Sequence, residues 1–164
     1  MHAEIESLGG EAGVISLYGF ENITIILWHG KPTVAAAEEL TRVSQHRRAK
    51  FPHGISAVHL VPATFELPDG PTRDTFAKLL RDGDGEGKLA VVCVLIRGGG
   101  FWASAMRSLL TGLRVLSRGS VDLGLHTDLG AAVDYLLPRH LERTGVPIGR
   151  EQLSAVLTKL FDAA

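Results

Sequence analysis

The chain has 164 residues, of which 45% are hydrophobic and 21% charged, a composition that favours a folded domain over a disordered chain. This length suits a single domain, which buries roughly 70% of the surface that its unfolded form exposes. With 17 basic and 18 acidic residues, the formal net charge of -1 gives no overall attraction for nucleic acid or an anionic membrane.

The N-terminal third predicts a β-hairpin followed by a helix. Residues 1–13 are expected to form a flexible N-terminus. Residues 14–18 and 23–28 are β-rich runs separated by a short Gly-containing segment, which predicts two antiparallel strands. Thr33 then predicts a helix N-cap, and apolar residues at helical spacing predict an amphipathic helix that ends near Lys50.

The middle of the chain alternates between strand and helix patterns. Residues 55–61 predict a strand, and Pro71 is placed for the first turn of a helix behind Asp69. The continuous Val-rich run 89–96 is typical of a strand covered on both faces, so we expect it to be the central strand of a largely parallel sheet. After Gly98, Gly99 and Gly100, apolar residues that share one face predict a long helix: Trp102, Ala105, Met106, Leu109, Leu113 and Leu116.

The C-terminal part completes the alternation and adds a further helix. Residues 121–126 predict a fifth strand, and Thr127 is the predicted cap of the next helix. Together, residues 14–144 predict one α/β domain. Residues 145–164 contain an amphipathic helix, expected to pack on the domain or at a homodimer interface. Its apolar face consists of Leu153, Val156, Leu157, Leu160 and Phe161.

Several features predict a cytoplasmic protein. Cys93, the single cysteine, lies inside an apolar run, so it is expected to be a buried hydrophobe and no disulfide is possible within the chain. The N-terminus lacks the pattern of a signal peptide. No apolar run approaches the ~20 residues needed to span a bilayer, so no stable membrane insertion is expected.

The order of these elements resembles the STAS domain family, which includes anti-sigma-factor antagonists, sulfate-transporter tails and small STAS/SEC14-like bacterial proteins. The residues that carry the resemblance lie at two strand-to-helix junctions: Trp28, Gly30 and Thr33, then Gly98, Gly100, Phe101 and Arg107. The resemblance implies a SpoIIAA-like (STAS) α/β fold: a five-stranded, mostly parallel sheet with an N-terminal hairpin, flanking helices and the extra C-terminal helix. Another small doubly wound α/β domain is the alternative.

The resemblance also implies two functions. The first is a non-enzymatic regulator or scaffold that resembles an anti-sigma-factor antagonist and binds another protein, an anti-sigma-like or kinase-like regulator. The second, from the SEC14-like members, is a small-molecule or lipid carrier. In the antagonists, a serine or threonine after the third strand is phosphorylated; here the candidates are Thr64, Thr72 and Thr75, although the compact acidic-Ser-Ser/Thr-Gly pattern is absent.

A glycine-rich junction with nearby arginines is the candidate partner- or anion-binding region. Its members are Arg97, Gly98, Gly99, Gly100, Phe101, Trp102, Arg107 and Arg114. Glycines before a helix allow backbone amides to approach an anion, and arginines add charge. The alternatives are a tight strand-to-helix turn and a solvated helix face.

The sequence predicts no catalytic residue, metal ligand or cofactor. It contains no GxSxG elbow, Walker loop, HExxH motif or close His/Cys cluster. His29, His59 and His126 lie on or at the ends of predicted strands, and their convergence in one pocket would raise the possibility of an enzyme.

Overall fold

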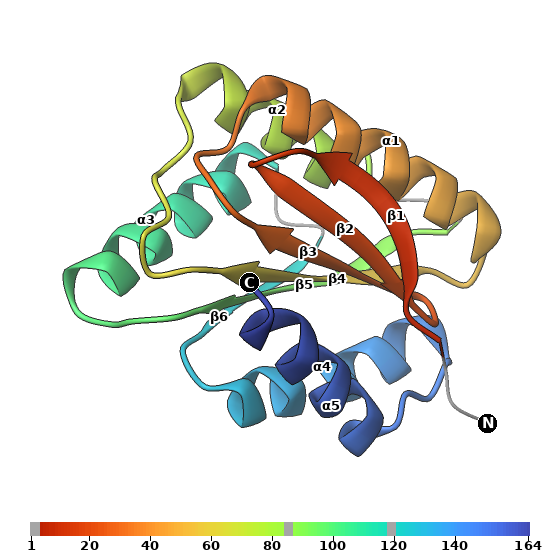
Figure 1. The fold of residues 1–164 in the computed structure, drawn as a ribbon. Coiled ribbons are helices and arrows are strands. Elements are labelled where there is room, and N and C mark those ends of the chain that lie inside the picture. Colours follow the sequence, from red (N-terminus) through yellow and green to blue (C-terminus); the bar gives the residue numbers. More distant parts are fainter. Residues whose placement is uncertain (1–3, 84–86, 118–120) are drawn as a thin grey trace.

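The computed structural model describes residues 4–83, 87–117 and 121–164, which form an α/β fold with one mixed sheet between two layers of helices (Figure 1). The strands are β1 (Glu6–Glu11), β2 (Ile15–Phe20), β3 (Ile23–Trp28), β4 (Ile55–Val61), β5 (Leu89–Ile96) and β6 (Asp122–His126). The helices are α1 (Val34–Lys50), α2 (Gly70–Arg81), α3 (Phe101–Leu116), α4 (Leu129–Thr144) and α5 (Arg150–Asp162).

The strands lie side by side in chain order, from β1 to β6. β1, β2 and β3 are antiparallel, whereas β3, β4, β5 and β6 are parallel. Each parallel strand is added on the same side of the previous one, and right-handed crossovers then place every connecting helix on one face. Accordingly, α1, α2 and α3 cover one face of the sheet, and α4 and α5 cover the other (Figure 1).

Side chains of β4 alternate between these two faces. Ala57 and Val61 belong to the core beneath α1–α3, whereas Val58 and Leu60 belong to the core beneath α4 and α5. The period of two along a strand causes this division. It also places His59, between Val58 and Leu60, on the α1–α3 side.

The first strand corrects the expected flexible N-terminus and five-stranded sheet. Glu6–Glu11 pairs with β2 as the sixth strand, with an irregular register between Ser7 and Gly9. Its sequence is polar and contains Gly9 and Gly10, and it is mostly exposed at the sheet edge. A strand that buries neither face has no hydrophobic alternation by which sequence could reveal it.

Three further predictions are corrected. The cap of α4 is Asp128, whose side chain accepts from the amide of Ala131, rather than Thr127. β5 is buried throughout, as predicted, but β6 alone separates it from the sheet edge, so it is not the central strand. The last helix takes the first of its two expected placements, on the domain: its apolar face is buried against β3 and α4, so only the dimer-interface alternative is corrected. The members of this face are Leu153, Val156, Leu157, Leu160 and Phe161.

A helix must be long and predominantly apolar to cross a bilayer. None of those in the described ranges is long and apolar enough to cross a membrane.

Candidate functional site

An apolar cavity lies between the sheet and the helices α1, α2 and α3. Its volume is about 90 Å³. The two helix layers contact different parts of the sheet. α4 packs against β5, whereas α3 contacts the edge strand β6 and α2 packs against α1 and α3.

The walls of this cavity are almost entirely apolar and contain no charged residue. The strands contribute Thr24, Trp28, Ile55, Ala57, His59, Val61, Leu89, Val92, Val94 and Leu123; the helices contribute Leu40, Ser44, Phe76, Leu79, Leu80, Met106, Leu109, Leu110 and Leu113; and the loops contribute Pro32, Phe65 and Pro68. Apart from the indole N–H of Trp28, the polar side chains in this set are Thr24, Ser44 and His59. A charged ligand group placed here would lose its hydration without gaining an opposite charge.

His59 is the titratable group of the cavity wall. Its Nδ1 accepts a 3.0 Å hydrogen bond from Nε1 of Trp28, and the two rings are stacked with an interplanar angle of 13°. The indole nitrogen can only donate, so Nδ1 is bare and the proton of the neutral imidazole is on Nε2. Burial lowers the pKa of His59 to about 4, so the ring is neutral at neutral pH.

Aromatic rings form one end of the cavity region. Phe65 and Phe76 both contact Trp28 edge-on, with ring centroids 5.6 and 5.9 Å away, and Phe65 contacts Trp102 at 6.0 Å. This cluster lies near the carboxyl ends of β3 and β4, where α/β sheets commonly hold ligands. Edge-to-face packing fixes the ring positions, so this wall is well ordered.

An outer groove between α2 and α3 adjoins the cavity. It has a volume of about 250 Å³ and is lined by Gly70, Arg73, Asp74, Ser108, Leu109, Gly112, Leu113 and Leu116. Leu109 and Leu113 line both the groove and the cavity. A Cβ atom at Gly112 would meet no other atom within 4 Å, so the groove is open at this helix position. The cavity and the α2–α3 groove are therefore neighbours that share the side chains of Leu109 and Leu113.

The structure separates the three candidate phosphoacceptors. Thr64 is exposed in the turn after β4, and Thr75 is partly buried and donates to the carbonyl of Pro71. Thr72 has no exposed surface, so a kinase could not reach it in this conformation, and the geometry favours Thr64 and Thr75 over Thr72 as candidates. Asp69 caps α2 by accepting from the amide of Thr72, and this bond lowers the pKa of its carboxyl.

The predicted anion-binding region is not a single site. Arg97 pairs with Asp162 at 2.7 Å and lies over the ring of Phe161, so it attaches the end of α5 to the sheet. Arg114 donates to the carbonyl of Leu123, and thereby attaches α3 to β6. Arg107 is exposed, with no side-chain partner among the described residues.

The other members of that region form the start of α3. Gly98 and Gly100 have φ angles of 98° and 66°, which only glycine adopts easily, and Gly99 lies between them in the loop. Phe101 is 91% exposed, whereas Trp102 packs against Phe65. The glycines therefore serve a tight strand-to-helix turn.

The strand histidines do not converge. His29 is exposed and bonded to Ser16 at the end of β3, and His59 faces the cavity. His126 contacts Tyr135 of α4, on the opposite face of the sheet. Within the described residues, no group of three or more His, Cys, Asp or Glu side chains could hold a metal ion.

A buried Ser–His–Asn chain is a feature that sequence analysis missed. Ser56 Oγ lies 2.7 Å from Nδ1 of His140, whose Nε2 lies 3.0 Å from Oδ1 of Asn22. The side-chain amide of Asn22 donates to the carbonyl of Gly54, so its Oδ1 faces His140 and accepts, and Ser56 donates to Nδ1. Burial lowers the pKa of His140 to about 4. All three side chains are at most 1% exposed, so this arrangement joins β3, β4 and α4 but cannot meet a substrate.

Cys93 carries the single thiol of the chain. It is buried on the α4 side of β5, as predicted, and burial raises the pKa of its thiol to about 12. It is therefore an unreactive core residue at neutral pH.

Comparison with known proteins adds no relative: no protein-family model, curated protein or solved structure matches this chain. The function of the chain is therefore inferred from its own geometry.

Proposed function

We propose that this protein binds a small, mostly apolar molecule in the cavity between the sheet and α1–α3. The observation that carries the proposal is a space of about 90 Å³ lined by described residues none of which is charged. Protein interiors contain few voids larger than a water molecule. An apolar molecule that fills this space would give its walls the packing contacts that they otherwise lack.

This proposal corresponds to the carrier function implied by the STAS/SEC14-like resemblance. The element order from the hairpin to α4 supports a SpoIIAA-like (STAS) fold as part of the same proposal. We assign the cavity a binding role rather than a catalytic one. Its side chains bring one neutral imidazole and two hydroxyl groups to the ligand, and no paired acid and base.

Filling the cavity is the direct test of this function. Ala57 lies on β4 in the cavity wall and is 7% exposed, so Ala57→Leu places the added carbon atoms in the cavity. We expect wild type to shift the xenon NMR resonance in a saturable manner, since xenon enters apolar cavities of this kind, and A57L to lose that shift.

The matched control adds the same atoms elsewhere. Ala35 is exposed on α1, so A35L should bind xenon as wild type does. Equal xenon shifts in A57L and wild type, with A57L folded by circular dichroism, would show that the binding space is not this cavity.

The outer face of α3 favours a second candidate function. In this function the protein is a regulator that resembles an anti-sigma-factor antagonist and acts by binding another protein. Phe101 and Val115 are 91% and 73% exposed and lie on this face, with Ser104, Ser108 and Gly112 between them. An exposed helix face with no charge and two large apolar residues is typical of a protein-binding surface.

A paired variant tests this second candidate. If α3 binds a regulator, the double variant F101S/V115S should lose a partner that wild type holds in a one-to-one complex of defined mass. Retention of the same complex by the variant would exclude this face as the binding surface.

A further inference from the structure

The cavity has one feature that selects among small molecules, and it is the imidazole of His59. Its Nδ1 is occupied by the indole of Trp28, which leaves Nε2–H as the donor. No hydrogen bond joins Nε2 to another of the described residues. A donor at the wall of an apolar space gains energy from a ligand that offers it an acceptor.

The other polar groups of the wall are less suited to this task. Thr24 is 2% exposed, and its Oγ1 lies within hydrogen-bonding distance of the guanidinium of Arg47. Ser44 is 6% exposed on α1 and makes no hydrogen bond to another of the described residues, but its hydroxyl rotates, so the direction of its donor is not fixed. His59 alone presents a planar donor whose direction is fixed, because stacking and the Trp28 bond hold the ring.

The absence of charge in the wall limits the ligand further. None of the lining residues is a lysine, arginine, aspartate or glutamate. A carboxylate or ammonium group in this cavity would be desolvated and unpaired, which strongly opposes binding.

We propose that the bound molecule is uncharged and carries one hydrogen-bond acceptor, such as a carbonyl or ether oxygen, that receives Nε2–H of His59. This inference rests on the proposed function of the cavity. Burial keeps the imidazole neutral, so the interaction is a neutral hydrogen bond and not an ion pair.

Two probes of the same shape test the acceptor. Cyclopentanone has a carbonyl oxygen where methylenecyclopentane has a methylene group, so the pair differs in the acceptor and little in size. Isothermal titration of each probe gives the selectivity of the protein for the ketone over the alkene. His59→Asn retains an oxygen near the position of Nδ1 for Trp28 and removes Nε2–H. We expect H59N to reduce the selectivity about fivefold to tenfold, the net contribution of one hydrogen bond.

Two controls complete the experiment. His53→Asn makes the same change at an exposed histidine outside the cavity and should leave the selectivity unchanged. In wild type, nitrogen NMR should show the Nε2–H resonance of His59 shift with the ketone and not with the alkene, an observation that does not depend on any variant.

Failure of this inference differs from failure of the proposed function. If both probes bind and the selectivity is equal in wild type and H59N, or falls equally in H53N, the acceptor assignment is wrong while the binding function stands. Isobutyrate binding as tightly as the ketone at neutral pH would also overturn the uncharged class. If neither probe binds wild type, the proposed function itself fails.

Discussion

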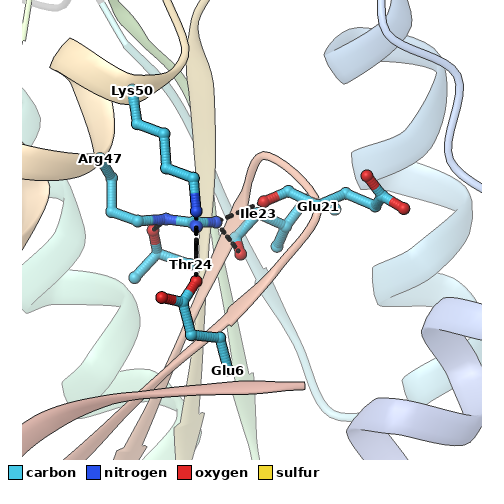
Figure 2. Close-up of polar contacts among 6 residues, drawn as sticks. All are labelled: Glu6, Glu21, Ile23, Thr24, Arg47 and Lys50. Atoms are coloured by element: carbon cyan, nitrogen blue, oxygen red, sulfur yellow. Dashed lines mark hydrogen bonds and ion pairs between the residues drawn. The ribbon is translucent and has the colours of Figure 1, made fainter. Parts of the chain in front are cut away.

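Arg47→Ala is expected to lower the free energy of unfolding by about 3 kcal/mol or more. Figure 2 shows the guanidinium of Arg47 directed toward Glu21, Ile23 and Thr24 of the β2–β3 hairpin and toward Glu6 of β1. Arg47 is 1% exposed, and it donates to the carbonyls of Glu21 and Ile23 and to Oγ1 of Thr24. Without the guanidinium, these buried acceptors lose their donor, and the space of the side chain is left unfilled.

The surroundings of Arg47 explain why no small residue can replace it. Its carboxylate partner Glu6, on β1, lies 3.8 Å away, and the ring of Phe51 lies beneath the guanidinium at 4.6 Å from the ring centroid. Burial lowers the pKa of Arg47, and Glu6 opposes that effect. A Cβ atom at Gly19 would lie 2.8 Å from Nη1, so glycine at this position gives the guanidinium its room.

Urea denaturation of wild type and three variants measures this effect. Arg47→Met retains most of the aliphatic stem, so its loss should be smaller than that of R47A, and the difference reports packing. Arg42→Ala is the matched control, since it removes an exposed arginine of the same helix that pairs with Glu39. An R47A protein as stable as R42A would contradict a structural role for the buried guanidinium.

Acidification from about pH 7 to about pH 5 is expected to lower the free energy of unfolding by about 4 kcal/mol in total, half from His59 and half from His140. Burial lowers the pKa of each imidazole from 6.5 to about 4. Between these values the unfolded chain binds protons that the folded chain does not. Stability is therefore greatest above about pH 6.5 and is lost as the pH falls toward about 4.

Single variants distinguish the contributions of His59 and His140 to the pH dependence from that of an exposed histidine. His140→Gln and His59→Asn should each remove about half of the pH dependence, whatever they do to stability at neutral pH. His53→Gln changes an exposed histidine and should leave the dependence as in wild type. A stability profile that is flat over this pH range in wild type would show that neither imidazole is held neutral by the fold.

Much of the fold could be predicted because its signals are local. The hairpin, the alternation of strand and helix, the buried β5 and the apolar face of α5 all follow from periodicity within a short window. The prediction for α3 was less accurate: of its expected apolar face, Met106 and Leu113 are buried, but Leu116 is 48% exposed. How deeply a helix is buried depends on its distance from the sheet, which periodicity does not contain.

The candidate site could not be predicted because its contacts join distant parts of the chain. Trp28 and His59 are 31 residues apart, and their hydrogen bond follows from the parallel register of β3 and β4. Ser56 and His140 are 84 residues apart and meet only when α4 packs on the sheet. In the sequence, Arg47 cannot be told apart from the other basic residues near the end of α1. In the structure it is among the most buried side chains.

Methyl NMR during titration with cyclopentanone tests most directly whether a small, mostly apolar molecule binds beneath α1–α3. If it does, the resonances of methyl groups that line the cavity should shift in a saturable manner; these belong to Val92, Met106 and Leu113. The methyl resonances of Leu153, in the core beneath α4 and α5, should not shift. Shifts confined to exposed Val115, or the absence of any saturable shift, would contradict binding in the cavity.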